Sequence, residues 1–424
     1  MNYASTFLSH SHADKPLVEL VAHELWQRGV VAWLDKNDLA AAMGADLSRA
    51  LREAVRRQAS VTIFLSDAAI NAAWVNDELA AALQQEDKDI LPVFIGDPLQ
   101  SVRAHDDLKR RWLHPDGRRI KVNYEQVDPN LPLATEAARI AEKIALRLYD
   151  KLQFSQSREV IICLDQRGKG SKRADDFPVP DHQKQMDAPA LVFRANNLPR
   201  TYTETLRDAE LTQFLQNVEW ALSHALATSR GSARKVYLSG EAQLALPFAV
   251  GKHFDRSNNA YLFCYNSKDG EVFCNDGQSL TQPLTGGNAH CEKQHPHIQP
   301  IAPGEQFVEA ALIVAKELYL PDALGWLQAH QLPHRHIWVE SEQFKDSQQA
   351  MRFVADVVAL LTRLKIEHGM NQVLLFIDLP FGVAPLLAAN LLHVAGSFTL
   401  MEFRKDFSAG GSAADQKYFP VLLP

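Results

Sequence analysis

Two residues four positions apart, Trp74 and Glu78, form the pair best suited to chemistry in this sequence. We predict a helix from about Trp74 to Leu83, and residues i and i+4 share one face of a helix. An indole plane can stack on an aromatic base, while a carboxylate can bind sugar hydroxyls or stabilise a developing positive charge. The plainer alternative is an exposed helical glutamate beside a tryptophan of the core.

Further polar residues follow short apolar runs in the first 150 residues. The runs are Ser5–Ser9, Val30–Leu34, Val61–Leu65 and Ile90–Ile95. Between them lie segments whose apolar residues recur at the spacing of a helix, and a last such segment contains Ala137, Ile140, Ile144 and Leu148. Strands that alternate with helices indicate a parallel sheet covered on both faces. Ligands of such sheets bind beyond the carboxyl ends of the strands. The residues that come at the ends of these runs, beginning with Ser9-His10, Asp35-Lys36 and Ser66-Asp67, are therefore the ones to inspect for a site.

These segments, in this order, resemble the TIR domain over roughly residues 1–150. The first box is Phe7-Leu8-Ser9-His10-Ser11 with Asp14-Lys15, and the second is Trp33-Leu34-Asp35 through Gly44, the BB loop. Trp74 with Glu78 matches the pair found in TIR domains that cleave NAD⁺. The resemblance implies a flavodoxin-like parallel sheet with Glu78 as the catalytic residue. It also implies substrate binding by Phe7, Ser9, Asp35, Asp38, Trp74 and Asp77.

The chemistry of such a site needs few groups. Cleavage of the N-glycosidic bond of NAD⁺ expels neutral nicotinamide, so no general acid is required, and one carboxylate can stabilise an oxocarbenium-like transition state. NAD⁺ is then a substrate, and no cofactor is expected. Two alternatives stay open. The TIR domain can act as a scaffold without catalysis, or it can form a cyclic ADP-ribose signal instead of linear ADP-ribose.

The chain after residue 158 shows a weak internal repeat. Each copy has a long amphipathic helix, a strand, a short apolar helix and a second strand. The first copy comprises Ala209–Ala227, Val236–Leu238, Leu244–Lys252 and Tyr261–Tyr265; the second comprises Ser347–Glu367, Val373–Ile377, Ala384–Leu392 and Phe398–Phe403. The repeat predicts a pseudo-symmetric domain with a ligand cleft between its halves.

Leu238-Ser239-Gly240 with Leu244–Phe254, and Leu375–Asn390 with its Asp378-Leu379-Pro380 turn, resemble the SAVED domain, which is a fusion of two CARF-like Rossmann units. The resemblance implies a cyclic di- or trinucleotide messenger as ligand, since turns at strand ends and helix N-termini bind phosphates. Ordinary strand–helix turns are the alternative. The residues expected at the ligand are Ser239, Gly240, Lys252, Pro380, Phe381, Gly382 and Arg404. TIR–SAVED fusions form a class of bacterial antiphage effector (CBASS), in which the messenger activates NAD⁺ destruction.

Length and composition agree with this organisation. A chain of 424 residues should hold two or three domains, which we assign as a TIR domain at 1–152, a polar linker at 153–158 and a SAVED domain at 159–424. The net charge of −7 excludes a basic coat for DNA binding. Four cysteines, no signal segment and no apolar stretch of spanning length indicate a cytoplasmic protein.

No metal site is expected. Cys264, Cys274, His290 and Cys291 stand closest to a metal-binding set, but their spacing fits no zinc pattern with a tight cysteine pair. The basic segment 167–173 lacks the spacing of a P-loop and is expected to be a loop near the messenger. We also expect messenger-bound molecules to stack head to tail into filaments, because heterologous contacts do not close. The Asp35–Gly44 loop of one TIR domain would then complete the Glu78 pocket of its neighbour.

Overall fold

The computed structural model describes most of the chain. The described residues are 2–34, 53–85, 88–115, 119–120, 122–166, 177–194, 208–227, 234–254, 260–265, 272–275, 284, 286–332, 335–341, 343–391, 394, 397–403 and 418–421. Two compact units are present. The first contains Met1–Ser155 and Pro189–Phe193 among its segments, and the second contains Gln156–Ser171, Phe177–Ala188 and Arg194–Pro424. The change of unit at Ser155 falls within the segment predicted as linker, where Phe154 is nevertheless fully buried.

The first unit is built on a five-stranded parallel sheet. Its elements are β1 (Asn2–Tyr3), β2 (Ser5–Ser9), α1 (Lys15–Gln27), β3 (Val31–Leu34), β4 (Ser60–Leu65), α4 (Asp67–Ile70), α5 (Ala73–Leu83), β5 (Asp89–Phe94), α6 (Pro98–Ala104), α7 (Asp106–Trp112), β6 (Glu125–Gln126) and α8 (Leu133–Lys151). The strand order of the sheet is β3-β2-β4-β5-β6, and β1 is not part of this sheet. This is the flavodoxin-like order 2-1-3-4-5, so the predicted fold class of the first unit is confirmed.

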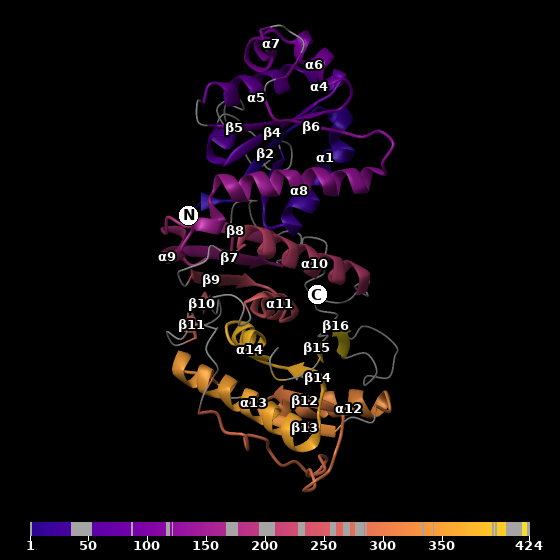
Figure 1. The fold of residues 1–424 in the computed structure, drawn as a ribbon, viewed down its shortest axis with the longest axis vertical. Helices are drawn as coiled ribbons and strands as arrows, with labels where there is room; N and C mark the ends of the chain where they lie inside the picture. Colours follow the sequence, from indigo (N-terminus) through magenta and orange to yellow (C-terminus); the bar gives the residue numbers. More distant parts are fainter. Residues whose placement is uncertain are drawn as a thin grey trace. The chain divides into compact units, whose positions relative to one another are not determined.

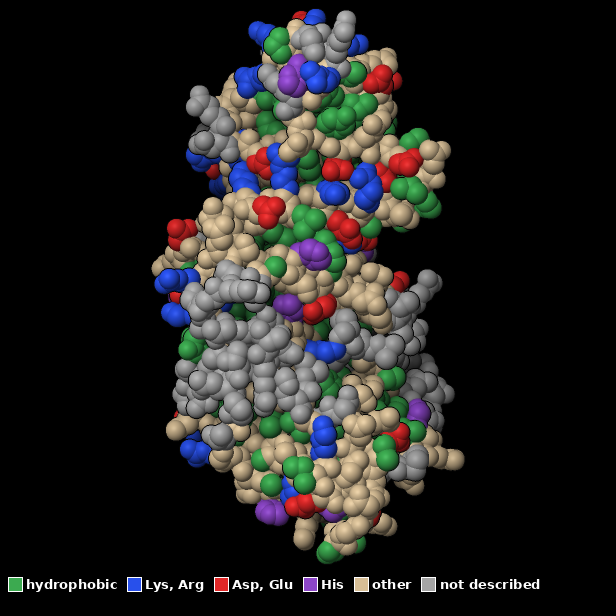
Figure 2. All heavy atoms as spheres, in the orientation of Figure 1, with side chains coloured by type: hydrophobic (Ala, Val, Ile, Leu, Met, Phe, Trp, Pro, Cys, Tyr) green, Lys and Arg blue, Asp and Glu red, His purple; other side chains and the backbone are tan. Residues whose placement is uncertain are grey.

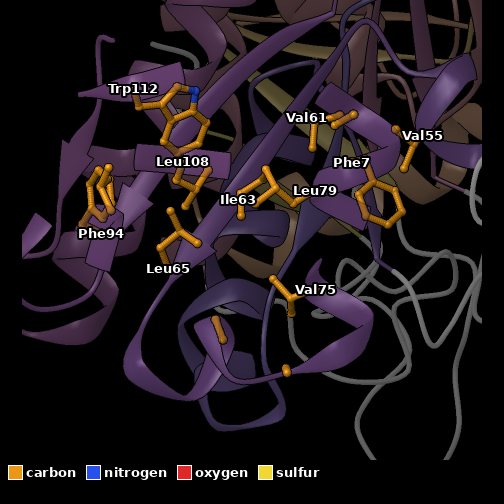
Figure 3. Close-up of a cluster of buried hydrophobic side chains, with 14 of the residues drawn as sticks. Phe7, Val55, Val61, Ile63, Leu65, Val75, Leu79, Phe94, Leu108 and Trp112 are labelled. Carbon is orange, nitrogen blue, oxygen red and sulfur yellow. The ribbon is translucent and has the colours of Figure 1, made fainter. Parts of the chain in front are cut away.

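Helices cover both faces of this sheet. Figure 1 shows α1 and α8 on one side and α4, α5, α6 and α7 on the other. The core on the α5 side joins Phe7 and Ile63 of the sheet to Val75 and Leu79 of α5, all buried (Figure 3). Val75, Leu79 and Ala82 recur at helical spacing, which is why α5 docks by this face.

A strand from far downstream belongs to the first unit. β8 (Pro189–Arg194) pairs in parallel with β1, and Asn2 lies opposite Pro189. The turn after α1 extends this contact, because the Val192 N–H donates to the Gly29 carbonyl at 2.9 Å. Gly29 has φ +73°, and a Cβ there would lie 3.0 Å from the Leu191 Cβ. The sequence repeat gave no sign of this pairing.

The second unit contains the predicted repeat. The first copy comprises β7 (Glu159–Asp165), α9 (Asp181–Lys184), α10 (Asp208–Ala225), β9 (Arg234–Glu241), α11 (Ala245–His253), β10 (Ala260–Tyr265) and β11 (Val272–Cys274); the second comprises β12 (Glu309–Ala315), α12 (Leu320–Ala329), β13 (Arg335–Glu340), α13 (Ser347–His368), β14 (Gln372–Ile377), α14 (Ala384–Leu391), β15 (Ser397–Phe403) and β16 (Tyr418–Val421). β7, β9 and β10 run parallel with β11 antiparallel at the edge, and β12, β14, β15 and β16 repeat this arrangement. Two α/β halves of one topology are therefore present.

The two short apolar helices α11 and α14 meet in the centre of the second unit (Figure 1). Every residue of α14 is buried, as are the first seven residues of α11. Helices that are apolar all round belong in a core rather than on a surface. Their contact joins the two halves of the repeat.

On one face of the molecule, the charged side chains of the described residues are of both signs (Figure 2). On the face drawn in Figure 2, basic and acidic side chains of the described residues intermingle and form no large patch of one sign. Within the described residues, no helix is long and apolar enough to cross a membrane.

Candidate functional site

Glu78 lies on the buried face of α5. It follows Val75 by three residues and precedes Ala82 by four, so the helical repeat that docks α5 also turns Glu78 inward. The residue is only 1% exposed, so the alternative of an exposed surface glutamate is wrong. A buried carboxylate is costly unless it accepts hydrogen bonds.

Ser9 provides such a hydrogen bond. It is the last residue of β2, it is fully buried, and its Oγ donates to Glu78 Oε2. β2 is held on both sides by parallel pairing with β3 and β4. The strand therefore presents the Ser9 hydroxyl from a rigid position at the carboxyl edge of the sheet.

A second buried carboxylate lies at the same edge. Asp14 Oδ2 accepts hydrogen bonds from Ser11 Oγ at 2.6 Å and from Ser66 Oγ at 2.7 Å. Ser66 follows β4 directly and also caps α4 through Ala69 N–H. Asp14 thus ties the segment after β2 to the segment after β4. The role of Asp14 was not predicted, although its place in the first box and the position of Ser66 after an apolar run were visible in the sequence.

These two carboxylates lie at the topological switch point of the sheet. β2 is the first strand of the sheet in chain order and β4 the third, and the chain leaves them toward opposite edges. Open α/β sheets bind ligands at the carboxyl ends of the two strands where this reversal occurs. Ser9, Glu78, Asp14 and Ser66 therefore mark the expected ligand crevice of the first unit.

The remaining predicted substrate residues are more dispersed. Phe7 is fully buried in the core and stacks on Trp33 at 5.3 Å between ring centroids, so its side chain packs inside the unit. Asp77 is exposed on α5. Trp74 lies one turn before Glu78 on the same helix. Asp35 and Asp38 lie outside the described residues.

In the second unit, the predicted ligand residues Ser239 and Gly240 lie near the end of β9. Ser239 is fully buried, and no described group forms a hydrogen bond with its Oγ. Gly240 has φ +139°, and a Cβ there would lie 2.0 Å from the Leu164 carbonyl oxygen of β7. Glycine is therefore required at this position by close backbone packing, which the sequence alone could not distinguish from phosphate binding.

Polar groups surround the ends of β7 and β9. Asp165 is buried and forms an ion pair with Arg194 at 3.0 Å. The neighbouring Gln166 binds across to Gln243, whose backbone N–H donates to the Gln166 Oε1 at 2.9 Å. Arg194 also lies over the Phe177 ring at 5.2 Å. Sequence reasoning missed this cluster, because its members come from distant segments.

The corresponding turn of the other half packs inward. Pro380 and Phe381 are half-buried, whereas Gly382 is buried. A Cβ on Gly382 would lie 2.7 Å from the Phe273 ring and 3.1 Å from the Cys264 carbonyl oxygen. The turn after β14 therefore contacts the β10–β11 hairpin of the first half.

Of the two basic residues predicted to bind the messenger, the structure describes only Lys252. Lys252 is half-buried on α11, and burial lowers the pKa of its amine, an effect that Glu219 opposes. Arg404 lies outside the described residues, as does the basic segment 167–173.

Burial affects two of the cysteine thiols. Cys264 is buried in β10, and burial raises the pKa of its thiol. Burial likewise raises the pKa of Cys291 to about 12, so neither thiol is disposed to ionise. Within the part of the chain that the structure describes, no three His, Cys, Asp or Glu side chains gather as a metal site.

Comparison with known families identifies the first unit. The family model of the TIR domain matches residues 6–120. This match spans β2 through α7 and includes Ser9, Asp14, Ser66 and Glu78. The N-terminal part of the chain is a TIR domain.

Among solved structures, similarity extends to the Cap4 SAVED/CARF-domain containing receptor of Acinetobacter baumannii, at 13% identity and a TM-score of 0.39, covering 98% of this chain and 78% of that chain. Its complex with the cyclic trinucleotide 3'3'3'-cAAA gives 12% identity and 0.41, covering 98% and 79%. The Moraxella osloensis Cap4 receptor gives 11% and 0.36, covering 89% and 84%. At such scores the similarity defines neither ligand nor activity. No curated protein matches the chain.

Proposed function

We propose that this protein is an NAD⁺ glycohydrolase that a cyclic oligonucleotide activates. The observation that carries the proposal is the buried Glu78, held by Ser9 at the switch point of a TIR domain. Glu78 and Ser9 are both buried, and low-dielectric surroundings strengthen the effect of a fixed carboxylate on a developing positive charge.

In the proposed reaction, the bond between ribose C1′ and the nicotinamide nitrogen breaks. The nitrogen keeps the bonding pair, so nicotinamide leaves as a neutral molecule and needs no proton. Glu78 stabilises the positive charge that develops on the ribose. The oxygen of water then bonds to C1′, one proton is released, and ADP-ribose is formed. Trp74, one turn before Glu78 on α5, is assigned to stacking on the substrate.

The second unit is assigned to messenger recognition. Its two halves share one topology, and their central helices α11 and α14 lie against each other. A cyclic oligonucleotide has repeated phosphates and bases, which suits a ligand site made of two similar halves. The segment around Ser239 and the turn at Pro380 and Phe381 are the proposed contacts, with Lys252 supplying positive charge. Destruction of NAD⁺ on receipt of such a messenger would serve antiphage defence.

Activation is proposed to proceed through assembly. A ligand shifts an equilibrium only when it binds one state better than the other. Messenger that is covered by the next molecule favours a stack, and head-to-tail contacts continue without closing. Activity should then rise more than linearly with protein concentration. A mixture of Glu78→Gln protein with a variant of the Asp38 loop should recover part of the activity.

The test uses the purified full chain with NAD⁺ and a panel of 3′3′ cyclic dinucleotides and 2′3′3′ and 3′3′3′ cyclic trinucleotides. We expect nicotinamide release with at least one compound and little release without any. Separation of the products by liquid chromatography distinguishes linear from cyclic ADP-ribose. Binding of a compound without nicotinamide release at any protein concentration would instead support a scaffold role and contradict the proposed activity.

A further inference from the structure

We propose that Ser9 is a positioning residue for the Glu78 carboxylate rather than a contact for substrate. This inference rests on the proposed function. Ser9 is fully buried, and its hydroxyl is directed to Glu78 Oε2. A side chain in that position affects the substrate only through Glu78, whose carboxylate it holds by a hydrogen bond.

The position of the Ser9 hydroxyl explains why its hydrogen bond to Glu78 matters for the reaction. A glutamate side chain has three rotatable bonds, and a carboxylate that must face a developing charge works best when its orientation is fixed beforehand. Ser9 is the last residue of β2, the middle strand of the β3-β2-β4 group. It lies opposite Ile63 of β4, and the preceding Leu8 lies between Leu34 of β3 and Thr62 of β4, so the backbone pairing that reaches Ser9 fixes its Cα. Its hydroxyl therefore fixes one carboxylate oxygen and directs the other.

The neighbouring hydroxyls serve a different carboxylate. Ser11 and Ser66 both donate to Asp14 Oδ2. Because these two hydroxyls are engaged in joining the ends of β2 and β4, neither replaces Ser9 at Glu78. Loss of the Ser9 hydroxyl should therefore lower the rate of catalysis, because neither Ser11 nor Ser66 takes its place.

The experiment compares Ser9→Ala, Ser9→Thr and Thr6→Val in the full chain, each activated by the compound of the panel that gives the highest wild-type rate. Thr6 is the matched control. It is a buried hydroxyl residue on β2, the strand of Ser9, and its Oγ1 bonds Thr62 Oγ1 of β4 at 3.0 Å and the Phe7 carbonyl at 3.5 Å rather than Glu78. Thr6→Val removes a buried hydroxyl but leaves the hydrogen bond between Ser9 and Glu78 in place. The measurements are kcat and KM for NAD⁺, with a thermal melt of each variant.

We expect Ser9→Ala to lower kcat by about 10- to 100-fold, as for a lost hydrogen bond to a charged group, with KM within about twofold. Ser9→Thr retains the hydroxyl and should recover most of kcat. Thr6→Val should lower the melting temperature but keep kcat. A rise in KM alone, or an unchanged kcat in Ser9→Ala, would overturn the positioning role.

Two further outcomes are decisive. If Ser9→Ala does not fold, Ser9→Cys preserves the volume and weakens the donor, so the same loss of kcat is expected and a wild-type kcat overturns the inference. If the wild-type protein releases no nicotinamide with any compound, the proposed function fails and the inference fails with it. An active wild type with an unaffected Ser9→Ala rejects the inference alone.

Discussion

The backbone of Gly251 in α11 lies directly against the carbonyl group of Pro385 in α14. A Cβ on Gly251 would lie 2.2 Å from the Pro385 oxygen and 2.5 Å from the Pro385 Cα. Both neighbours are backbone atoms of a buried helix, so neither can turn away. The close approach of the two repeat halves therefore depends on this glycine.

Gly251→Ala should destabilise the second unit by about 1–3 kcal/mol, because the two helices must separate to admit the methyl group. The direction of the change in stability distinguishes this contact from an open helix, in which alanine would be more stabilising than glycine by about 1 kcal/mol. Urea unfolding followed by circular dichroism measures the change. Unchanged or increased stability would show that α11 and α14 are not in backbone contact.

Gly29→Ala should loosen the pairing between β1 and β8. The substitution places a side chain at φ +73° and 3.0 Å from the Leu191 Cβ. Amide hydrogen exchange should become faster at Ala4 and Val192, whose N–H groups bind Ala190 and Gly29.

Gly304→Ala is the control for this prediction, because it has nearly the same backbone angle, φ +74°, in open space. It should leave exchange at Ala4 and Val192 unchanged. Equal exchange in both variants and in the wild type would argue against β8 as part of the first unit.

Stability of the first unit should fall on acidification through Glu136. This buried carboxylate accepts from the Arg139 guanidinium at 2.7 Å and from the Asp128 N–H at 3.0 Å, and the bond to Arg139 lowers its pKa. A lowered pKa stabilises the folded state above the unfolded value, about 4.3, and that contribution is lost as pH falls toward the folded pKa. Arg139→Gln should therefore cost about 1 kcal/mol at pH 7 and less at pH 3. The same loss at both values would contradict this role of the pair.

The sequence predicted elements with strong periodicity well. The Ser347–Glu367 prediction was confirmed as α13 at Ser347–His368, and the predicted Tyr261–Tyr265 strand as β10 at Ala260–Tyr265. Apolar spacing is a local property, so a single segment contains the information. β6 was missed, because it has two residues, Glu125 and Gln126, and no apolar pattern.

The site was only partly predictable, because its contacts are non-local. The residue types at Trp74 and Glu78 indicated the chemistry, but the Ser9–Glu78 bond joins residues 69 positions apart and the Asp14–Ser66 bond joins residues 52 apart. Burial of Phe7 likewise depends on packing against α5 and Trp33. Gly240 and Gly382 drew attention as turn glycines, whereas close contact with Leu164 and Phe273 explains both.

The proposed NAD⁺ cleavage depends most directly on Glu78. Nicotinamide release by Glu78→Gln, compared with the wild type at equal protein and activator concentration, tests it in one measurement. The amide retains the shape and the bond from Ser9 but removes the charge, so we expect turnover to fall by about 100-fold or more while the melting temperature changes little. Turnover near that of the wild type in a folded Glu78→Gln protein would contradict the catalytic assignment.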